Sequence, residues 1–216
     1  MRRFFVVASV VFGLAGVAVA SAAASSINLI APWGDAVYSY SGTDRITLTY
    51  SISASGHIPQ DAVDAAQLAV NEWAIWLAGS DGSGSFTVIP VAAGSRANVK
   101  ISIKGGGGNI LGQTLLSVDR QGFIKGATVQ ISGSTFGLAN DPDTVHEITL
   151  HELGHALVGL GHSDDSSDLM FPTLGSNSTG IGACELAGFN ALYSTWLTDG
   201  LDTSGPTQPG DSSATC

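Results

Sequence analysis

Two histidines four residues apart, His151 and His155, are the residues of this chain best placed to do chemistry. Positions four apart lie on one face of an α-helix, about 6 Å of rise from each other, so both imidazoles can bind one metal ion. Glu152 lies about 100° around the helix from His151, where its carboxylate can reach a water on that metal. This arrangement is typical of a zinc site with a glutamate as general base, and it predicts hydrolysis.

A third histidine, His162, follows two closely spaced glycines. In an uninterrupted helix it would lie about 16 Å along the axis from His151, too far to share a metal ion. Gly159 and Gly161 are able to end the helix and reverse the chain, because glycine adopts the left-handed conformation. We expect His162 to be the third ligand. The alternative third ligands are Asp164, Asp165 and Glu185.

The run HELGHALVGLGHS resembles the zinc signature of the metzincin metallopeptidases. The serine directly after the third histidine, Ser163, resembles the pattern of the matrixin branch of that clan. The downstream segment Asp168–Pro172 resembles the clan's Met-turn, and Met170 lies eight residues after His162, as in the family. Two motifs at the family's separation make this resemblance specific.

The resemblance implies a zinc endopeptidase with one catalytic zinc ion. In this reading the imidazoles hold the ion, a zinc-bound water attacks the peptide carbonyl, and Glu152 is the general base. Met170 packs under the zinc site, and the following residues line the specificity pocket. The implied ligands are His151, His155 and His162, and the implied pocket wall is Phe171, Pro172 and Thr173.

One departure from the family pattern concerns the third histidine. In the family the third histidine lies ten positions after the first, whereas His162 lies eleven positions after His151. Val158 stands where the family has glycine, and Gly159 follows it. We expect the helix to run one residue longer, or to bulge, so that His162 still reaches the metal. If it does not, Glu185 is the candidate for a site built like that of the gluzincins.

The flanking sequence predicts the elements that hold this site. Alternating apolar residues predict a strand at 45–53, and Pro59 is suited to open the next helix. That helix carries an apolar stripe that we expect to face the core: Val63, Ala66, Val70, Trp73 and Leu77. Further strands are expected at 86–91, 98–103, 114–118 and 123–131.

The second half of the chain predicts two more helices. Asp143 or Thr144 is expected to cap the active-site helix, which runs to about Val158. The last helix, at 183–197, has these residues on its expected inner face: Leu186, Phe189, Leu192, Tyr193 and Trp196. Over residues 43–197 the resemblance implies the α+β metzincin fold, a twisted mixed β-sheet with a backing helix, the zinc helix, the Met-turn and a C-terminal helix. It also implies that substrate lies along the edge strand of the sheet.

Both ends of the chain have their own composition. Residues 1–24 combine a basic start, an apolar run and small residues, which predicts a signal peptide and a secreted protein. An uncleaved anchor at the cell surface is the alternative. Residues 25–42 form an N-terminal segment, and residues 198–216 are expected to be a flexible tail. In an oxidising compartment Cys184 and Cys216 are expected to form a disulfide, with free or intermolecular thiols as the alternative.

Composition limits the partners. Without Arg2 and Arg3 the chain has six basic and eighteen acidic side chains, a formal net charge of −12. Such a chain repels nucleic acid and anionic membranes, so we expect neither as a stable partner. About 190 residues remain after the leader, one domain by size, and we expect a monomer acting on polypeptides.

Other metals and other functions stay open. No histidine occurs between Gly105 and Ser132, so a second, histidine-bound zinc is not expected there. Calcium binding is possible through turn aspartates, which in their simpler role are turn or cap residues: Asp81, Asp119, Asp141 and Asp143. The alternative functions are a non-catalytic zinc-binding or adhesive extracellular domain, and a zinc hydrolase of non-protein amides.

Overall fold

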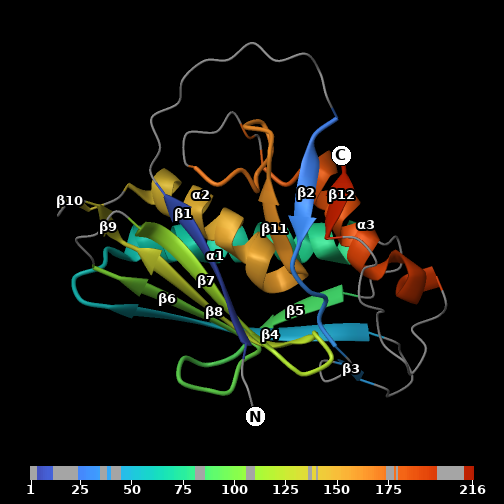
Figure 1. Cartoon of the computed structure of the whole chain (residues 1–216). Coiled ribbons are helices and arrows are strands. Elements are labelled where there is room, and N and C mark those ends of the chain that lie inside the picture. The colour runs from blue at the N-terminus through green and yellow to red at the C-terminus, as the bar shows by residue number, and fades with distance from the viewer. Residues whose placement is uncertain are drawn as a thin grey trace.

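The computed structural model combines a large twisted sheet, a small sheet and three main helices (Figure 1). It describes residues 4–11, 24–34, 38–39, 45–80, 86–105, 110–135, 138–139, 141–173, 178, 180–198 and 212–216. Helices α1 (Gln60–Ser80) and α2 (Pro142–Leu153) pack together on one side of the large sheet. The α+β class and the mixed sheet with a backing helix, expected from the sequence, are confirmed.

The large sheet has the strand order β1-β7-β8-β6-β4-β3, with β5 also paired to β4. Its strands are β1 (Phe4–Val11), β3 (Tyr38–Ser39), β4 (Arg45–Ser55), β5 (Phe86–Pro90), β6 (Val99–Lys104), β7 (Ile110–Val118) and β8 (Ile124–Ser132). The strands β4, β5, β6 and β8 run parallel, whereas β7 is antiparallel to β8. The four strands predicted after residue 85 all form, and β7 begins four residues earlier than expected.

Strand β1 falls within the predicted signal peptide. Its residues pair antiparallel with β7, from Phe4 opposite Val118 to Val11 opposite Ile110. Because β7 pairs with β8 on its other side, β1 covers what is otherwise the outer edge of the sheet. Among the described residues, none of the helices combines the length and apolar character needed to span a bilayer.

Helix α1 (Gln60–Ser80) follows the stripe predicted from the sequence. Four of the five stripe residues are fully buried, and Val63 is half-buried against the core. At the centre of the stripe, the indole Nε1 of Trp73 donates a hydrogen bond of 2.8 Å to the Leu150 carbonyl of α2. Helix α1 therefore packs against the sheet and fixes the position of α2, the helix that carries His151.

The small sheet joins three distant parts of the chain. Strand β2 (Ser26–Leu29) lies between β11 (Leu160–Ser163) and β12 (Ser213–Thr215). The C-terminal strand β12 thus pairs with the segment that follows residue 24, and both lie beside α3 (Ala183–Thr198) (Figure 1). Strand β11 carries His162, so the N-terminal segment pairs directly with a strand of the candidate site. The short hairpin strands β9 (Ser134–Thr135) and β10 (Leu138–Ala139) complete the elements.

Two expectations about the C-terminal region are corrected. The tail was expected to be flexible, but its last residues form β12 because they pair with β2 and because Cys216 is joined to Cys184 by a disulfide. Residues 199–211 lie outside the described residues. On α3, Phe189, Leu192 and Tyr193 are buried as expected, whereas Leu186 is 37% exposed because it faces away from the core. The side chain of Trp196 lies outside the described set.

We expect Cys216→Ser to destabilise the protein by about 3 kcal/mol, because the disulfide closes a loop across a sequence separation of 32 residues. Cys216 is exposed, so its replacement leaves no cavity, unlike replacement of the buried Cys184. Denaturant unfolding of the variant and the parent measures the difference. Equal unfolding midpoints and equal slopes would mean that the bond does not restrain the tail.

Candidate active site

Helix α2 (Pro142–Leu153) carries His151 and Glu152, and its N-terminus is capped by Asp141. The Asp141 carboxylate accepts hydrogen bonds from the Thr144 amide and hydroxyl, both at 2.9 Å, so the expectation of Asp143 or Thr144 as the cap is corrected. Pro142 sits at the first helical position, where its missing N–H costs nothing and its fixed φ suits the helix. The N-cap of the helix therefore lies two or three residues earlier than expected from the sequence.

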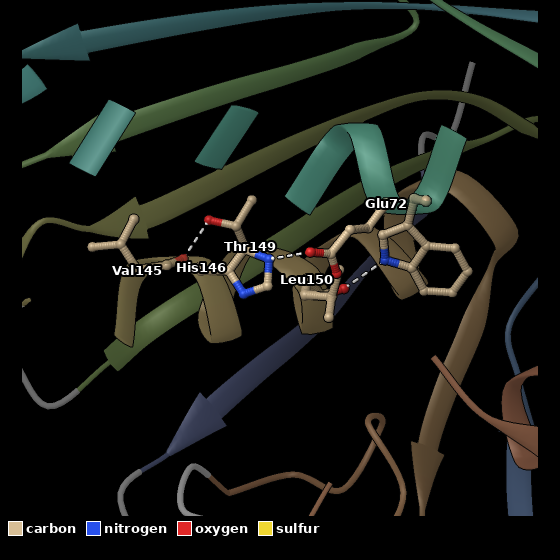
Figure 2. A network of polar contacts seen from close by, with 6 residues as sticks. Glu72, Val145, His146, Thr149 and Leu150 are labelled. Carbon is tan, nitrogen blue, oxygen red and sulfur yellow. Dashed lines mark hydrogen bonds and ion pairs between the residues drawn. The ribbon is translucent and has the colours of Figure 1, made fainter. Parts of the chain in front are cut away.

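A second contact ties α2 to α1. The His146 imidazole meets the Glu72 carboxylate at 3.0 Å, and Figure 2 shows this pair bridging the two helices beside Leu150. One turn away, the Thr149 hydroxyl donates to the Val145 carbonyl of its own helix. His146 is thus used in helix packing and lies outside the group of histidines described next.

The extra residue before His162 is absorbed by one π-helical turn. After Leu153 the α-helix widens over Gly154–Val158, and the Gly159 amide contacts both the Gly154 carbonyl, five residues back, and the His155 carbonyl, four residues back. A π-turn inserts one residue into a helix without displacing what precedes it. Gly159 then takes a left-handed φ of 88°, and the chain reverses into β11. Of the two expected possibilities, a longer helix or a bulge, the structure has the bulge.

This turn brings three histidines together. The ring centroids lie 4.9 Å apart for His151 and His155, 5.4 Å for His151 and His162, and 5.0 Å for His155 and His162. One ring nitrogen from each lies within 4.8 Å of the others. Each Nε2 is buried and has no hydrogen-bond partner among the described residues. Three convergent, unpartnered imidazole nitrogens fit a metal such as zinc, which is bound by neutral imidazole.

Backbone carbonyls fix the orientation of two of these rings. The Nδ1 of His151 lies 2.8 Å from the Leu169 carbonyl, and the Nδ1 of His155 lies 2.7 Å from the Leu160 carbonyl. A carbonyl only accepts, so each Nδ1 carries the proton and each Nε2 keeps its lone pair for a metal. The Met-turn segment and the strand after the π-turn thus orient the first two histidines.

Burial gives these side chains the protonation state that a metal site needs. Burial lowers the pKa of His151 to about 4, although the Leu169 carbonyl opposes the change, and it holds the pKa of His155 well below its usual value. Burial also lowers the pKa of His162. The imidazoles are therefore neutral at pH 7, which is the form that binds a metal.

Glu152 lies beside the three histidines and is completely buried. Its Oε2 accepts a hydrogen bond of 2.6 Å from the Thr114 hydroxyl of β7, whereas Oε1 has no partner within the described part of the chain. Burial raises the pKa of Glu152 to about 8, against the lowering effect of Thr114. A cation bound nearby favours the ionised carboxylate, so the group is suited to act as a base when the site holds a metal.

The expected Met-turn packs under the π-turn. Met170 is fully buried, and a Cβ on Gly154 would lie 2.3 Å from its Sδ, so glycine is needed for this contact. Glu185 holds the turn from the other side, because its carboxylate accepts hydrogen bonds from the Met170 amide at 3.1 Å and the Gly182 amide at 2.8 Å. The three residues after Met170, expected as the pocket wall, are half-buried: Phe171, Pro172 and Thr173.

The alternative third ligands are engaged elsewhere. Asp164 accepts hydrogen bonds from the Ser26 amide at 2.7 Å and hydroxyl at 2.9 Å, and Asp165 accepts from the Ser167 amide and hydroxyl. Glu185 binds the Met-turn as described above. The structure thus brings His162, rather than any of these carboxylates, to His151 and His155.

Two of the candidate calcium residues, Asp119 and Asp141, accept hydrogen bonds from backbone amides. Asp119 accepts from the Gln121 and Phe123 amides of its turn and pairs with Lys125 at 3.5 Å. Asp141 caps α2, and Asp81 lies outside the described residues. These contacts are the turn and cap roles that the sequence analysis gave as the simpler interpretation.

Several residues that hold the π-turn and Glu152 in place were not predicted from the sequence. The Tyr193 hydroxyl lies 2.8 Å from the Val158 carbonyl and 3.0 Å from the Trp33 amide, and the Trp33 indole donates to the Ala156 carbonyl at 3.1 Å. Together they satisfy carbonyls of the π-turn that the widened helix leaves free. Thr114 and the neighbouring Gly112 were missed as well. These contacts join segments that are far apart in the chain, so the spacing of residues within one segment does not reveal them.

We expect Gly159→Ala to destabilise the fold by more than about 2 kcal/mol. A Cβ at this position would lie 1.8 Å from the Ala31 carbonyl oxygen, and the backbone φ of 88° already disfavours alanine. Gly94→Ala is the matched control, since its φ is 86° but nothing lies within 4 Å of the added Cβ. If thermal unfolding shows equal losses for the two variants, the close approach at Gly159 is not important.

Comparison with known families supports this geometry. A comparison with curated proteins returned no match. The family model for matrixin, Peptidase_M10, matches residues 42–194, which include the large sheet from β4 onward, all three histidines and the Met-turn. Because the match covers well over half of the chain, this protein belongs to the matrixin family of metallopeptidases.

Proposed function

We propose that this chain is a secreted zinc endopeptidase that hydrolyses peptide bonds in extended polypeptides. The observation that carries the proposal is the convergence of three unpartnered Nε2 atoms beside the buried carboxylate of Glu152. A zinc-binding or adhesive module has no need of a buried acid at that point. Burying a carboxylate without full hydrogen bonding is costly, so its presence favours catalysis.

His151, His155 and His162 would hold the ion through Nε2. Zinc bound there supplies Lewis-acid activation of water and of the substrate carbonyl. The Nδ1 hydrogen bonds to Leu169 and Leu160 keep the rings of His151 and His155 from turning, so these two ligands are oriented before the ion binds.

Glu152 moves the proton. Its unpartnered Oε1 takes a proton as water adds to the carbonyl and returns it to the leaving amine as the bond breaks. Because Oε2 stays bound to Thr114, the same oxygen, Oε1, serves both steps. The scheme needs no nucleophilic serine or cysteine, and no acyl-enzyme forms.

Strand β7 is the natural docking strand for substrate. It contacts Glu152 through Thr114, and its outer edge pairs with β1. An extended peptide binds an exposed strand edge by main-chain hydrogen bonds. Cleavage of the leader at Ala20 or Ala24 would remove β1 and leave that edge for an antiparallel substrate, with Phe171, Pro172 and Thr173 beside its side chains.

The test uses the chain from residue 25 onward, assayed on casein, on a peptide library and on small and cell-wall amides. We expect cleavage of the proteins and peptides, loss of activity when zinc is chelated, and its return when zinc is added. Cleavage of the non-protein amides alone would indicate the amide hydrolase. Stoichiometric zinc with no hydrolysis of any substrate would indicate the non-catalytic module, and both results contradict the proposal.

A further inference from the structure

We propose that Thr114 is a positioning residue for catalysis, which holds the Glu152 carboxylate in the orientation that proton transfer needs. The inference rests on the proposed function, because it concerns the same reaction. Thr114 lies on β7, thirty-eight residues before Glu152, outside the zinc-binding motif and the Met-turn. Nothing in the spacing of those motifs points to it.

The contact is short and secluded from water. Thr114 Oγ1 lies 2.6 Å from Glu152 Oε2 and 3.1 Å from the Glu152 backbone carbonyl, and both residues are 0% exposed. A threonine hydroxyl has one proton to donate, and the ionised carboxylate at the shorter distance is the stronger acceptor. The Glu152 carboxylate therefore has one hydroxyl donor on Oε2 and no partner on Oε1 among the described residues.

The backbone of β7 is shaped around this carboxylate. Gly112, two residues before Thr114 on the same face of the strand, packs against Glu152. A Cβ on Gly112 would lie 2.6 Å from Oε1 and 2.7 Å from Cγ. Glycine at one position leaves room for the reacting oxygen, and threonine at the next position on that face binds the other oxygen. The two residues form a cradle that fixes the rotation of the carboxylate.

An uncharged hydroxyl is a suitable hydrogen-bond donor to a carboxylate that acts as a general base. A lysine or arginine in its place would bind the carboxylate as an ion pair and hold the proton-accepting oxygens by charge. Threonine donates one hydrogen bond, carries no charge, and is stiff at χ1 because it is β-branched. The carboxylate stays oriented while Oε1 remains available, and fixed orientation of a reacting group lowers the barrier to its reaction.

The test compares Thr114→Val, Thr114→Ala and Thr114→Ser with the parent. Valine keeps the shape and removes the donor, so we expect kcat to fall by about 10- to 100-fold, the effect of losing one hydrogen bond to a charged group, with KM and zinc content unchanged. Serine restores the donor and should recover most of the parent kcat. Thr128→Val is the matched control, since Thr128 on β8 pairs with Leu115 and faces the other side of the sheet.

A Thr114→Val protein with the parent kcat would overturn the inference, as would equal kcat values for the serine and valine variants. If the valine variant fails to fold, serine against alanine decides, and equal kcat in that pair also overturns it. These failures leave the proposed function intact when the parent cleaves peptides and Glu152→Ala does not. Failure of the proposed function appears instead as a parent that does not cleave, or as a fully active Glu152→Ala variant.

Discussion

Glu152→Ala is expected to lower kcat for peptide hydrolysis by about 10²- to 10⁴-fold while the protein keeps its zinc. The carboxylate lies outside the group of three imidazoles that converges on the metal position, so its removal takes away the base and leaves the ligands. Steady-state cleavage of a fluorogenic peptide gives kcat, and atomic absorption gives zinc per chain. The fold should survive, because a buried carboxylate that lacks a full set of partners stabilises little.

The matched control is Glu185→Gln. Glu185 is equally buried and also lies near the site, but its carboxylate binds the amides of Met170 and Gly182. Glutamine keeps one acceptor oxygen and replaces the other by a donor, so one of the two amide contacts and some stability are lost, whereas we expect the folded variant to keep zinc and most of its activity. If Glu152→Ala cleaves as fast as the parent, Glu152 is not the base.

His162→Ala is expected to lose zinc and, with it, peptidase activity. A catalytic zinc site uses three protein ligands, and two imidazoles alone bind the ion far more weakly. The structure places the His162 ring 5.0 Å from that of His155 and 5.4 Å from that of His151, measured between centroids. Zinc titration of the chelated protein, followed by competition with a metal indicator, measures the loss of affinity.

His146→Ala serves as the control for this second prediction. His146 lies on the same helix as His151, but its ring pairs with Glu72 of α1 and takes no part in the three-histidine group. We expect it to keep full zinc affinity and to lose only helix packing. Zinc affinity that is unchanged in His162→Ala would mean that another residue completes the site.

Local patterns in the sequence predicted most of the elements that hold the site. Strand β4 shows alternation, with Ile46, Leu48 and Tyr50 all buried, and α1 shows a stripe at helical spacing. Such periodicities follow from the geometry of one helix or strand, so they can be recognised in a single sequence. The same reasoning placed His151 and His155 on one helical face, and they lie there in the structure.

Features that depend on distant contacts could not be predicted in this way. The π-turn is stabilised by Trp33 and Tyr193, and β12 is held by β2 and by the Cys184–Cys216 bond. The sequence showed one extra residue before His162, but the position at which the helix widens depends on contacts with Trp33 of the N-terminal segment and Tyr193 of α3. Thr114 meets Glu152 only because β7 lies under α2.

In the proposed site three imidazoles bind one zinc ion, with His162 brought to the metal by the π-turn. X-ray absorption at the zinc edge of the purified, zinc-loaded protein measures this ligand set. We expect a first shell of nitrogen and oxygen at about 2.0 Å, with outer-shell scattering from three imidazole rings. Scattering from only two imidazoles, or from sulfur, would contradict it.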